Sequence, residues 1–338
     1  MRVLVTGGSG FIGSHLVERL AATGHTVMNV DRDRPLVETT CEFAQIDICN
    51  REDVLECVGS WGPDVIAHLA AETHVDRSID GPEAFLTTNI LGTFNLLNSV
   101  LKLSASDPSD APRFIHVSTD EVFGSVAGSG TFTEGSPYRP RSPYAASKAS
   151  ADHLVRAWQT TYGLKTVVTN TCNNFGPRQH PEKLIPHMIT RALNGWPLPV
   201  YGDGSNVRDW IYVSDHAAAL QRIIESEATD GTYLIGARAE RSNIDIVRTV
   251  CRNLDLERPR AEGSYEELIT FVADRPGHDK RYAIDPTHME STFGWTPAVS
   301  LEEGLASTVR WYLDHEDWTA QLVADGYSPE RIGQGPTP

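Results

Sequence analysis

Short apolar runs alternate with amphipathic stretches along the first half of the chain. The runs are rich in β-branched residues and predict strands at 2–6, 26–30, 43–46, 64–69, 113–117 and 166–171. The stretches between them carry apolar residues at helical spacing and predict helices near 11–23, 51–58, 83–103 and 143–162. Continuous apolar strands separated by amphipathic helices favour a parallel sheet covered on both faces. We therefore expect an α/β fold with a Rossmann-type, doubly wound parallel sheet.

The predicted helix 83–103 is apolar around more than one face. Its apolar positions are Phe85, Leu86, Ile90, Leu91, Phe94, Leu97, Val100 and Leu101. A surface helix that buries only one face has a narrower apolar stripe than these positions form. We expect the second face to be buried by another subunit, in a homodimer formed through helices 83–103 and 143–162.

After about residue 172 the pattern breaks into shorter pieces that are rich in proline and glycine. Segments 176–186 and 274–279 have the composition of binding loops. We expect residues 1–172 to form the Rossmann domain, with further elements from about 207–235. Residues 173–325 should form a smaller α/β substrate-binding domain, and residues 326–338 a flexible tail.

Composition and charge exclude several classes of protein. The 338 residues are 40% hydrophobic and 22% charged, which is typical of a globular protein. A formal net charge of -16 disfavours a nucleic-acid partner. No apolar run is long enough to predict a membrane span, and the N-terminus enters a strand with no signal-peptide core. We expect a cytoplasmic protein.

The cysteines and histidines give no sign of a metal centre. The five cysteines are scattered, and no Cys/His set has the spacing of zinc ligands. The 12 histidines form no H-E-x-x-H motif. We expect free thiols, as in a reducing compartment, and no bound metal.

The first predicted strand runs into T-G-G-S-G-F-I-G, a glycine-rich turn that opens a helix. Such glycines allow a tight turn and let a pyrophosphate approach the backbone at the positive end of the helix. Asp31 closes the second strand, where a carboxylate would accept the ribose hydroxyls of adenosine. It would also repel a 2′-phosphate, so we expect NAD rather than NADP, although Arg32 and Arg34 weaken that preference.

A tyrosine and a lysine stand four residues apart in S-P-Y-A-A-S-K. This spacing places Tyr144 and Lys148 on one face of a helix. An ammonium beside a phenol lowers the pKa of the phenol and makes Tyr144 a candidate general base. Upstream, the strand F-I-H-V ends in S-T-D-E, and the adjacent carboxylates of Asp120 and Glu121 at a buried strand end need a partner or a use.

These motifs together resemble an extended short-chain dehydrogenase/reductase, and more narrowly the dTDP-glucose 4,6-dehydratase family. The resemblance covers nearly the whole chain and includes H-L-A-A-E-T-H-V-D-R-S-I (68–79), S-T-D-E-V-F-G (118–124) and Y-A-A-S-K (144–148). It continues through N-N-F-G-P-R-Q-H-P-E-K-L-I-P (173–186), V-Y-G-D-G-S-N-V-R-D-W-I-Y-V (200–213) and D-R-P-G-H-D-K-R-Y (274–282).

The resemblance implies a role for each member of the central motifs. Tyr144, supported by Lys148, takes the proton of the sugar C4 hydroxyl, and Thr119 hydrogen-bonds that oxygen. Glu121 then removes the C5 proton while Asp120 protonates the departing C6 hydroxyl. The net reaction is redox-neutral, so NAD should remain bound.

The resemblance also implies two sets of binding residues. The cofactor set is Gly7, Gly10, Phe11, Ile12, Gly13, Asp31, Asp47, Ile48, Leu69, Ala70, Ala71, Thr88, Tyr144, Lys148 and Asn174. The nucleotide-sugar set is Thr73, Thr119, Asn173, Lys183, Leu184, Pro199, Tyr201, Arg208, Asn243, Arg275 and His278. Arg208 is the expected clamp on the diphosphate, because a guanidinium grips it with two hydrogen bonds.

The chain departs from the family pattern in two places. Only 15 residues, R-D-R-P-L-V-E-T-T-C-E-F-A-Q-I, separate Asp31 from Asp47. We expect a more open adenosine site and weaker retention of NAD. Thr73 stands where serine is usual, and G-P-R-Q-H-P replaces a more aromatic loop.

Other functions stay open at this point. A UDP-glucose 4,6-dehydratase would use the same residues, since no motif excludes UDP. A UDP-sugar 4-epimerase shares the NAD site and the Tyr–Lys pair but has no need for the proton donor Asp120. A catalytically silent NAD sensor would have lost Tyr144 or Lys148, which are both present.

Overall fold

The computed structural model describes residues 1–37, 39–104, 111–126 and 128–324. The predicted flexible tail, 326–338, lies outside the described residues. Within the described ranges, no helix is both long and apolar enough to cross a membrane.

A seven-stranded sheet, with every pair of neighbouring strands parallel, forms the larger lobe, and its strand order is β10-β6-β5-β4-β1-β2-β3. The strands are β1 (Arg2–Thr6), β2 (Thr26–Asp31), β3 (Glu42–Gln45), β4 (Val65–His68), β5 (Arg113–Thr119), β6 (Thr166–Thr171) and β10 (Thr232–Ile235). The order reverses between β1 and β4, which is the arrangement of a doubly wound sheet. The predicted α/β fold is therefore confirmed.

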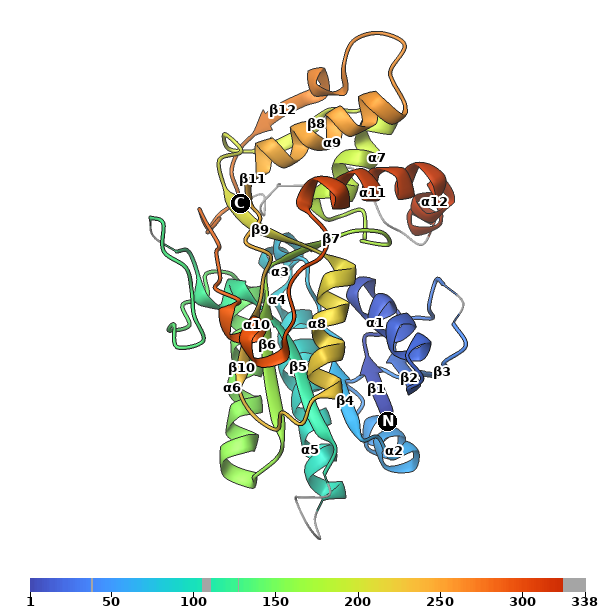
Figure 1. The fold of residues 1–338 in the computed structure, drawn as a ribbon, viewed down its shortest axis with the longest axis vertical. Coiled ribbons are helices and arrows are strands. Elements are labelled where there is room, and N and C mark those ends of the chain that lie inside the picture. The colour runs from blue at the N-terminus through green and yellow to red at the C-terminus, as the bar shows by residue number, and fades with distance from the viewer. Residues whose placement is uncertain (38, 105–110, 127, 325–338) are drawn as a thin grey trace.

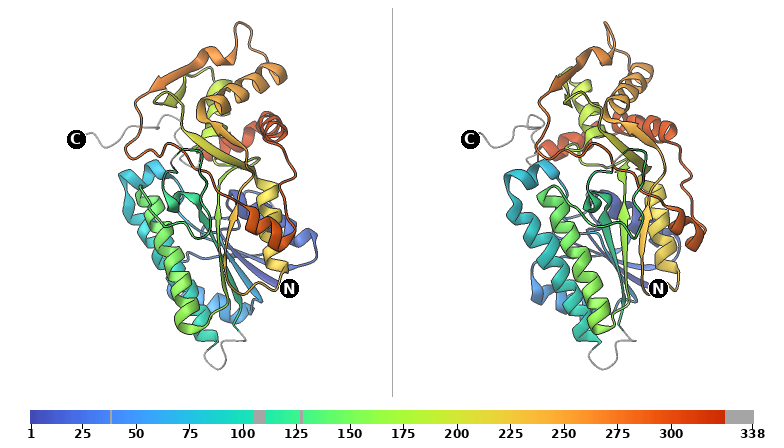
Figure 2. Two further views of the ribbon diagram at one scale, coloured as in Figure 1. Left: turned by 60° about the vertical axis from the view of Figure 1, so that its left-hand side comes forward. Right: turned by 90° about the vertical axis from the view of Figure 1, so that its left-hand side faces the viewer.

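Helices cover both faces of this sheet, because alternate strand residues point to opposite faces. Val3 and Val5 lie in one core with α1 (Phe11–Ala22) and α8 (Val213–Glu225). Leu4 lies in the other core, with α2 (Arg51–Trp61), α5 (Thr93–Leu103) and α6 (Pro143–Tyr162). In Figure 2, α5 and α6 run side by side along the outer surface of the lobe.

The long helix predicted at 83–103 is built from three consecutive segments. They are α4 (Pro82–Phe85), the π-helical turns η1 (Leu86–Gly92) and α5. Gly92 sits against Ile48, where an added Cβ would meet the side chain at 2.5 Å. The helix thus passes directly over the end of the β3–α2 connection that lines the site described below.

The second lobe has two small sheets and a separate core (Figure 1). One sheet joins β7 (Asn173–Phe175), β9 (Val207–Tyr212) and β11 (Glu240–Ser242), and the other joins β8 (Leu198–Tyr201) and β12 (Ile269–Val272). The packed helices are α7 (Leu184–Leu193), α9 (Asn243–Glu257), α11 (Leu301–Asp314) and α12 (Glu316–Ala324). Between β9 and β11 the chain returns to the first lobe through α8 and β10, and α10 (Thr287–Phe293) packs on β10.

Candidate active site

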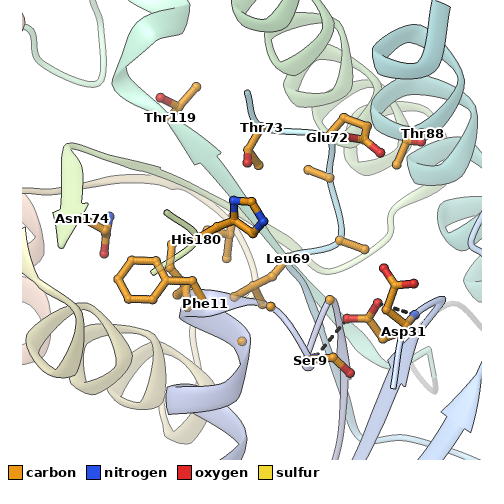
Figure 3. Close-up of a pocket in the computed structure, with 18 of the residues that line it drawn as sticks. Ser9, Phe11, Asp31, Leu69, Glu72, Thr73, Thr88, Thr119, Asn174 and His180 are labelled. Atoms are coloured by element: carbon orange, nitrogen blue, oxygen red, sulfur yellow. Dashed lines mark hydrogen bonds between the residues drawn. The ribbon is translucent and has the colours of Figure 1, made fainter. Parts of the chain in front are cut away.

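A cavity of about 870 Å³ opens at the carboxyl ends of the parallel strands. It extends from the turn after β1 to the ends of β5 and β6 and reaches the loop before α7. Ligands of doubly wound sheets bind at this edge. In Figure 3, Thr119 and Asp31 lie at opposite sides of the view, with Leu69 and His180 between them.

The glycine-rich turn after β1 is packed tightly against neighbouring backbone, so only glycine fits at two of its positions. The absence of side chains leaves the backbone N–H groups open to the cavity. Gly7 has a φ of +73°, and a Cβ there would meet the backbone nitrogen of Ala70 at 2.6 Å. A Cβ on Gly13 would meet the carbonyl oxygen of Gly7 at 2.0 Å. Gly10 is the N-cap of α1, so the free N–H groups of this helix start face the cavity. This cradle fits a pyrophosphate.

Asp31 lies at the end of β2 and is oriented by two backbone donors. Its Oδ2 accepts from the amide of Ser9 (3.0 Å) and its Oδ1 from the amide of Asp33 (3.1 Å). Burial raises the pKa of Asp31, and these two amides oppose the rise. Arg32 forms an ion pair with Glu72, with 2.8 Å between Nη1 and Oε1. The carboxylate is therefore held in place at the rim of the cavity, and its role toward an adenosine ribose stays a prediction.

Tyr144 and Lys148 both line the cavity from the first turns of α6. The amide of Tyr144 donates to Ser78 Oγ (3.2 Å), and the Nζ of Lys148 donates to the carbonyl oxygen of Val117 (2.9 Å). Burial raises the pKa of the Tyr144 phenol, the charge of Glu121 raises it further, and a hydrogen bond with Thr119 lowers it. Burial lowers the pKa of Lys148 to about 8. The prediction of a lowered phenol pKa is therefore wrong for this structure, because burial and the charge of Glu121 dominate.

The two adjacent carboxylates follow Thr119 at the end of β5, in the single 3₁₀ turn η3 (Asp120–Phe123). Thr119 caps this turn by accepting from the amide of Glu121 at 3.2 Å. Asp120 is only 1% exposed, and its Oδ2 has no hydrogen-bond partner among the described residues. Glu121 is less buried.

Burial and neighbouring charges act differently on the pKa values of Asp120 and Glu121. Burial, and then the charge of Glu121, place the pKa of Asp120 well above its usual value. Burial also raises the pKa of Glu121, but Arg275, Arg208 and Lys183 oppose that rise. Adjacent acids in one site divide in this way into a proton donor and a proton acceptor. Burial therefore favours the protonated form of Asp120, while three cations favour the ionised form of Glu121.

The structure brings all 15 residues of the predicted cofactor set onto one cavity. They are Gly7, Gly10, Phe11, Ile12, Gly13, Asp31, Asp47, Ile48, Leu69, Ala70, Ala71, Thr88, Tyr144, Lys148 and Asn174. Of the predicted nucleotide-sugar set, Thr73, Thr119, Asn173 and Lys183 line the same cavity. The remaining members lie in the second lobe and do not line it; they are Leu184, Pro199, Tyr201, Arg208, Asn243, Arg275 and His278.

Several of these second-lobe residues are engaged with other protein groups. Arg208 is 4% exposed, donates to the carbonyl oxygen of Asp279 (2.9 Å) and lies 4.1 Å from the ring centroid of Tyr282. His278 Nδ1 lies 2.6 Å from Asp274 Oδ1. Arg208 and Arg275 nevertheless act on the charge of Glu121, so both guanidinium groups lie near the reacting end of the cavity.

Sequence reasoning missed other residues that line the cavity. They include Ser9, Arg32, Glu72, Arg77, Gln179, His180 and Glu182. Segment 176–186 has the composition of a binding loop, and this signal points to Gln179, His180 and Glu182. For Glu72 and Arg77 the sequence offers a weaker indication, which is their position in the H-L-A-A-E-T-H-V-D-R-S-I block.

The fold and the site define a class of protein. A glycine turn, an acid at the end of β2 and a Tyr–Lys pair on one cavity are the features of an extended short-chain dehydrogenase/reductase. The GDP-mannose 4,6 dehydratase family model matches residues 4–308. A dTDP-glucose 4,6-dehydratase of Neisseria meningitidis is 48% identical, with 99% of each chain covered. An Escherichia coli dTDP-glucose 4,6-dehydratase is 45% identical, covering 98% of this chain and 99% of the relative.

Solved structures give the same result. The dTDP-glucose 4,6-dehydratase of Streptomyces venezuelae with NAD and TYD bound has a TM-score of 0.86 at 40% identity, covering 95% of this chain and 100% of that one. A Thermus thermophilus UDP-glucose 4-epimerase with NAD has a TM-score of 0.84 at 31% identity, covering 93% and 100%. The chain belongs to the dTDP-glucose 4,6-dehydratase family.

Proposed function

We propose that this protein is an NAD-dependent lyase that dehydrates dTDP-glucose to dTDP-4-keto-6-deoxyglucose. The observation that carries the proposal is the pair Asp120 and Glu121, whose pKa values are raised to different degrees on the cavity that also holds Tyr144. Elimination of water needs one acid and one base together. An epimerase only removes and returns a hydride and has no use for the acid.

The first step concerns the C4 hydroxyl of the sugar. NAD, when bound, supplies the hydride acceptor for C4 and later the hydride for C6. Tyr144 takes the hydroxyl proton, and Thr119, whose Oγ1 also caps η3, hydrogen-bonds the same oxygen. Lys148 keeps a positive charge near the phenol. The residues predicted to bind NAD are proposed to hold it along the cavity, with its adenosine at Asp31.

Elimination follows at C5 and C6 of the sugar. The C4 ketone acidifies the C5 hydrogen, and Glu121 removes it as the base. Asp120, kept protonated by its burial, protonates the C6 hydroxyl so that water can leave. Glu121 then returns its proton to C5 as hydride is returned to C6, which completes the redox-neutral cycle. Arg208, Arg275 and Lys183 oppose the rise in the pKa of Glu121 and so favour its ionised form, and we assign the same cations to the diphosphate.

The two lobes divide the work in this proposal. Residues 1–172, with elements from about 207–235, would bind NAD, and residues 173–325 would bind the nucleotide and sugar. The pairing of β10 with β6 supports the assignment of residues from about 207–235 to the NAD-binding domain, because it places β10 in the large parallel sheet. Leu184, Pro199, Tyr201, Asn243 and His278 are assigned to the nucleotide sugar on the family resemblance alone.

We further propose a homodimer formed through the outer faces of α5 and α6. Leu91 is 54% exposed and Leu103 45% exposed on the helix that ends in α5, while Tyr162 is 43% exposed at the end of α6. Phe94 packs edge-on against Trp158 (ring centroids 5.8 Å apart), so the aromatic surface continues from α5 to α6. A paired apolar surface of this kind favours a second subunit.

A cytoplasmic location is proposed from the thiols. All five cysteines are free, and two of them are buried. Proteins of reducing compartments use cysteine in this way.

The first experiment is the mass of the product after incubation with dTDP-glucose, run in parallel with UDP-glucose. A product lighter by one water supports the 4,6-dehydratase, and the relative rates settle the preferred base. An unchanged mass with an altered sugar proton spectrum would make the protein an epimerase and contradict the role of Asp120. The NAD content of the purified protein tests retention, since stoichiometric, tightly held NAD would contradict the expected open adenosine site.

A further inference from the structure

A fully buried carboxylate lies behind the Tyr144–Lys148 pair, and the mechanism above gives it no task. Asp152 is one helical turn beyond Lys148 on α6 and is 0% exposed. Its Oδ2 accepts hydrogen bonds from the hydroxyl of Tyr138 (2.7 Å) and from Nδ2 of Asn170 (3.1 Å). Nε2 of His116 lies 3.2 Å from Oδ1.

The groups that hold Asp152 are themselves fixed. Arg156 donates to the hydroxyl of Tyr138 at 2.7 Å and lies 4.8 Å from the centroid of its ring. Asn170 also donates to the carbonyl oxygen of Thr119 (3.1 Å), the residue that precedes the acid–base pair. The carboxylate is thus held rigidly by groups from three parts of the chain, and one of them extends to the reacting end of the cavity.

The surroundings of Lys148 contain titratable groups from several elements. They are Tyr144, Asp152 and Arg156 on α6, His116 on β5, His68 on β4, and Asp120 and Glu121 on η3. Burial lowers the pKa of His116 to about 4 and places the pKa of His68 well below its usual value, so both rings are neutral at pH 7.

Asp152 is charged under the same conditions. Burial alone would raise its pKa, but the contacts with His116, Lys148 and Tyr138 outweigh burial and place the pKa below its usual value. Burial lowers the pKa of Lys148 to about 8, and the charge of Asp152 opposes this fall. The Nζ of Lys148 otherwise donates to an uncharged carbonyl oxygen, that of Val117.

We propose that Asp152 is a positioning residue that keeps the buried Lys148 in its ammonium form. A buried ammonium without an ionised partner gives up its proton. Loss of that charge would remove the cation that stabilises a Tyr144 phenolate. The proposal deepens the proposed function and rests on it for the role of Tyr144, but the protonation of Lys148 can be measured without any substrate.

The chain is well suited to a direct measurement because it has only five lysines: Lys102, Lys148, Lys165, Lys183 and Lys280. Protein labelled with 13C at the lysine ε-carbon should give few signals, and Lys148→Arg identifies the one of interest. In Asp152→Asn, the titration midpoint of Lys148 should fall by about one pH unit or more. Tyr138→Phe removes one hydrogen bond but keeps the carboxylate, and its midpoint should stay close to that of the unmodified protein.

Asp152→Ser provides a second neutral variant, with space for water, in case the asparagine variant does not fold. A Lys148 midpoint that moves by less than about 0.3 unit in the folded neutral variant would overturn the proposal. In the pH profile of kcat/KM with dTDP-glucose, the alkaline limb should move to lower pH by the same amount in that variant. A uniform loss of activity at every pH, with no shift of the limb, would show a purely structural role. Failure of all variants and of the unmodified protein to release water would instead contradict the proposed function, while the titration would still decide the role of Asp152.

Discussion

Asp76 and Arg275 form an ion pair that joins the two lobes, with 3.0 Å between Oδ1 and Nη1. Asp76 is at the start of α3 (Val75–Asp80) in the sheet lobe, and Arg275 lies in the loop after β12. The hydroxyl of Tyr201 donates to the other oxygen of Asp76 at 2.9 Å. Burial would raise the pKa of Asp76, but Arg275 and Tyr201 outweigh burial and lower it. One carboxylate therefore orients two of the residues assigned to the nucleotide sugar.

Asp76→Asn should weaken binding of the nucleotide sugar more than it slows the chemistry. The neutral amide no longer orients the guanidinium of Arg275, and a hydrogen bond to a charged group contributes enough to change affinity roughly ten-fold. We expect KM to rise by about that factor with a much smaller change in kcat. Asp203→Asn is the control, because Asp203 is exposed on the second lobe, which also carries Arg275, and accepts from Ser205 of its own loop. A fall in kcat with KM unchanged would contradict the positioning role of Asp76.

Glu121→Gln and Asp120→Asn should separate oxidation from elimination. Neither change removes Tyr144, so bound NAD should still be reduced by the sugar, which is visible as near-ultraviolet absorbance of the nicotinamide. Release of water should slow by roughly 10²–10⁴-fold, which is the usual contribution of one acid or base. Stopped-flow absorbance and product mass measure the two steps. Unchanged turnover in both variants would refute the assignment.

Asp120→Asn should also change stability in a pH-dependent way. The folded-state pKa of Asp120 is raised, so the folded protein binds a proton that the unfolded chain releases, and stability falls as pH rises above the unfolded value. The asparagine stays neutral and avoids this loss. At pH 8 we expect a higher midpoint of thermal unfolding for the variant, by about 2 °C for each kcal/mol gained in the free energy of unfolding. At pH 4 the difference between variant and unmodified protein should be smaller. A difference that grows towards acid pH would contradict the raised pKa.

Gly13→Ala should impair binding of NAD. Alanine usually stabilises a helix by about 1 kcal/mol relative to glycine, but the new Cβ would meet the carbonyl oxygen of Gly7 at 2.0 Å. The turn must open, and we expect NAD affinity to fall by at least about ten-fold. Gly135→Ala is the matched control, since a Cβ there has nothing within 4 Å. Calorimetric titration with NAD measures both; equal affinities would show that the turn adapts freely.

Leu91→Asp should disrupt the proposed dimer. Leu91 is 54% exposed, and a buried unpaired carboxylate in an interface is strongly unfavourable. We expect the variant to sediment as a monomer of 37.1 kDa while the unmodified protein sediments at twice that mass. Leu256→Asp is the control, because Leu256 is 81% exposed at the end of α9 in the other lobe. A monomeric unmodified protein would contradict the dimer itself.

Local features of the chain were sufficient to predict most of the sheet lobe. The strand at 166–171 and the helix at 143–162 have the predicted bounds, because each has a clear apolar period and turn signals at its ends. The glycine turn and the Tyr144–Lys148 pair were found for the same reason, since each is a short-range spacing. The π-helical turns at Leu86–Gly92 were missed, because their apolar pattern does not differ from that of an α-helix.

The rest depended on contacts between residues that are far apart in the sequence. Asp76 and Arg275 are 199 positions apart, and nothing in either local segment indicates their pairing. The different environments of Asp120 and Glu121 come from burial and from cations of the second lobe, so adjacency alone could not assign the donor and the acceptor. The sequence by itself determined which chemical groups are present and their order along the chain. Only the tertiary structure decided their charge states and partners, because pKa values and ion pairs depend on distance and on exclusion of water.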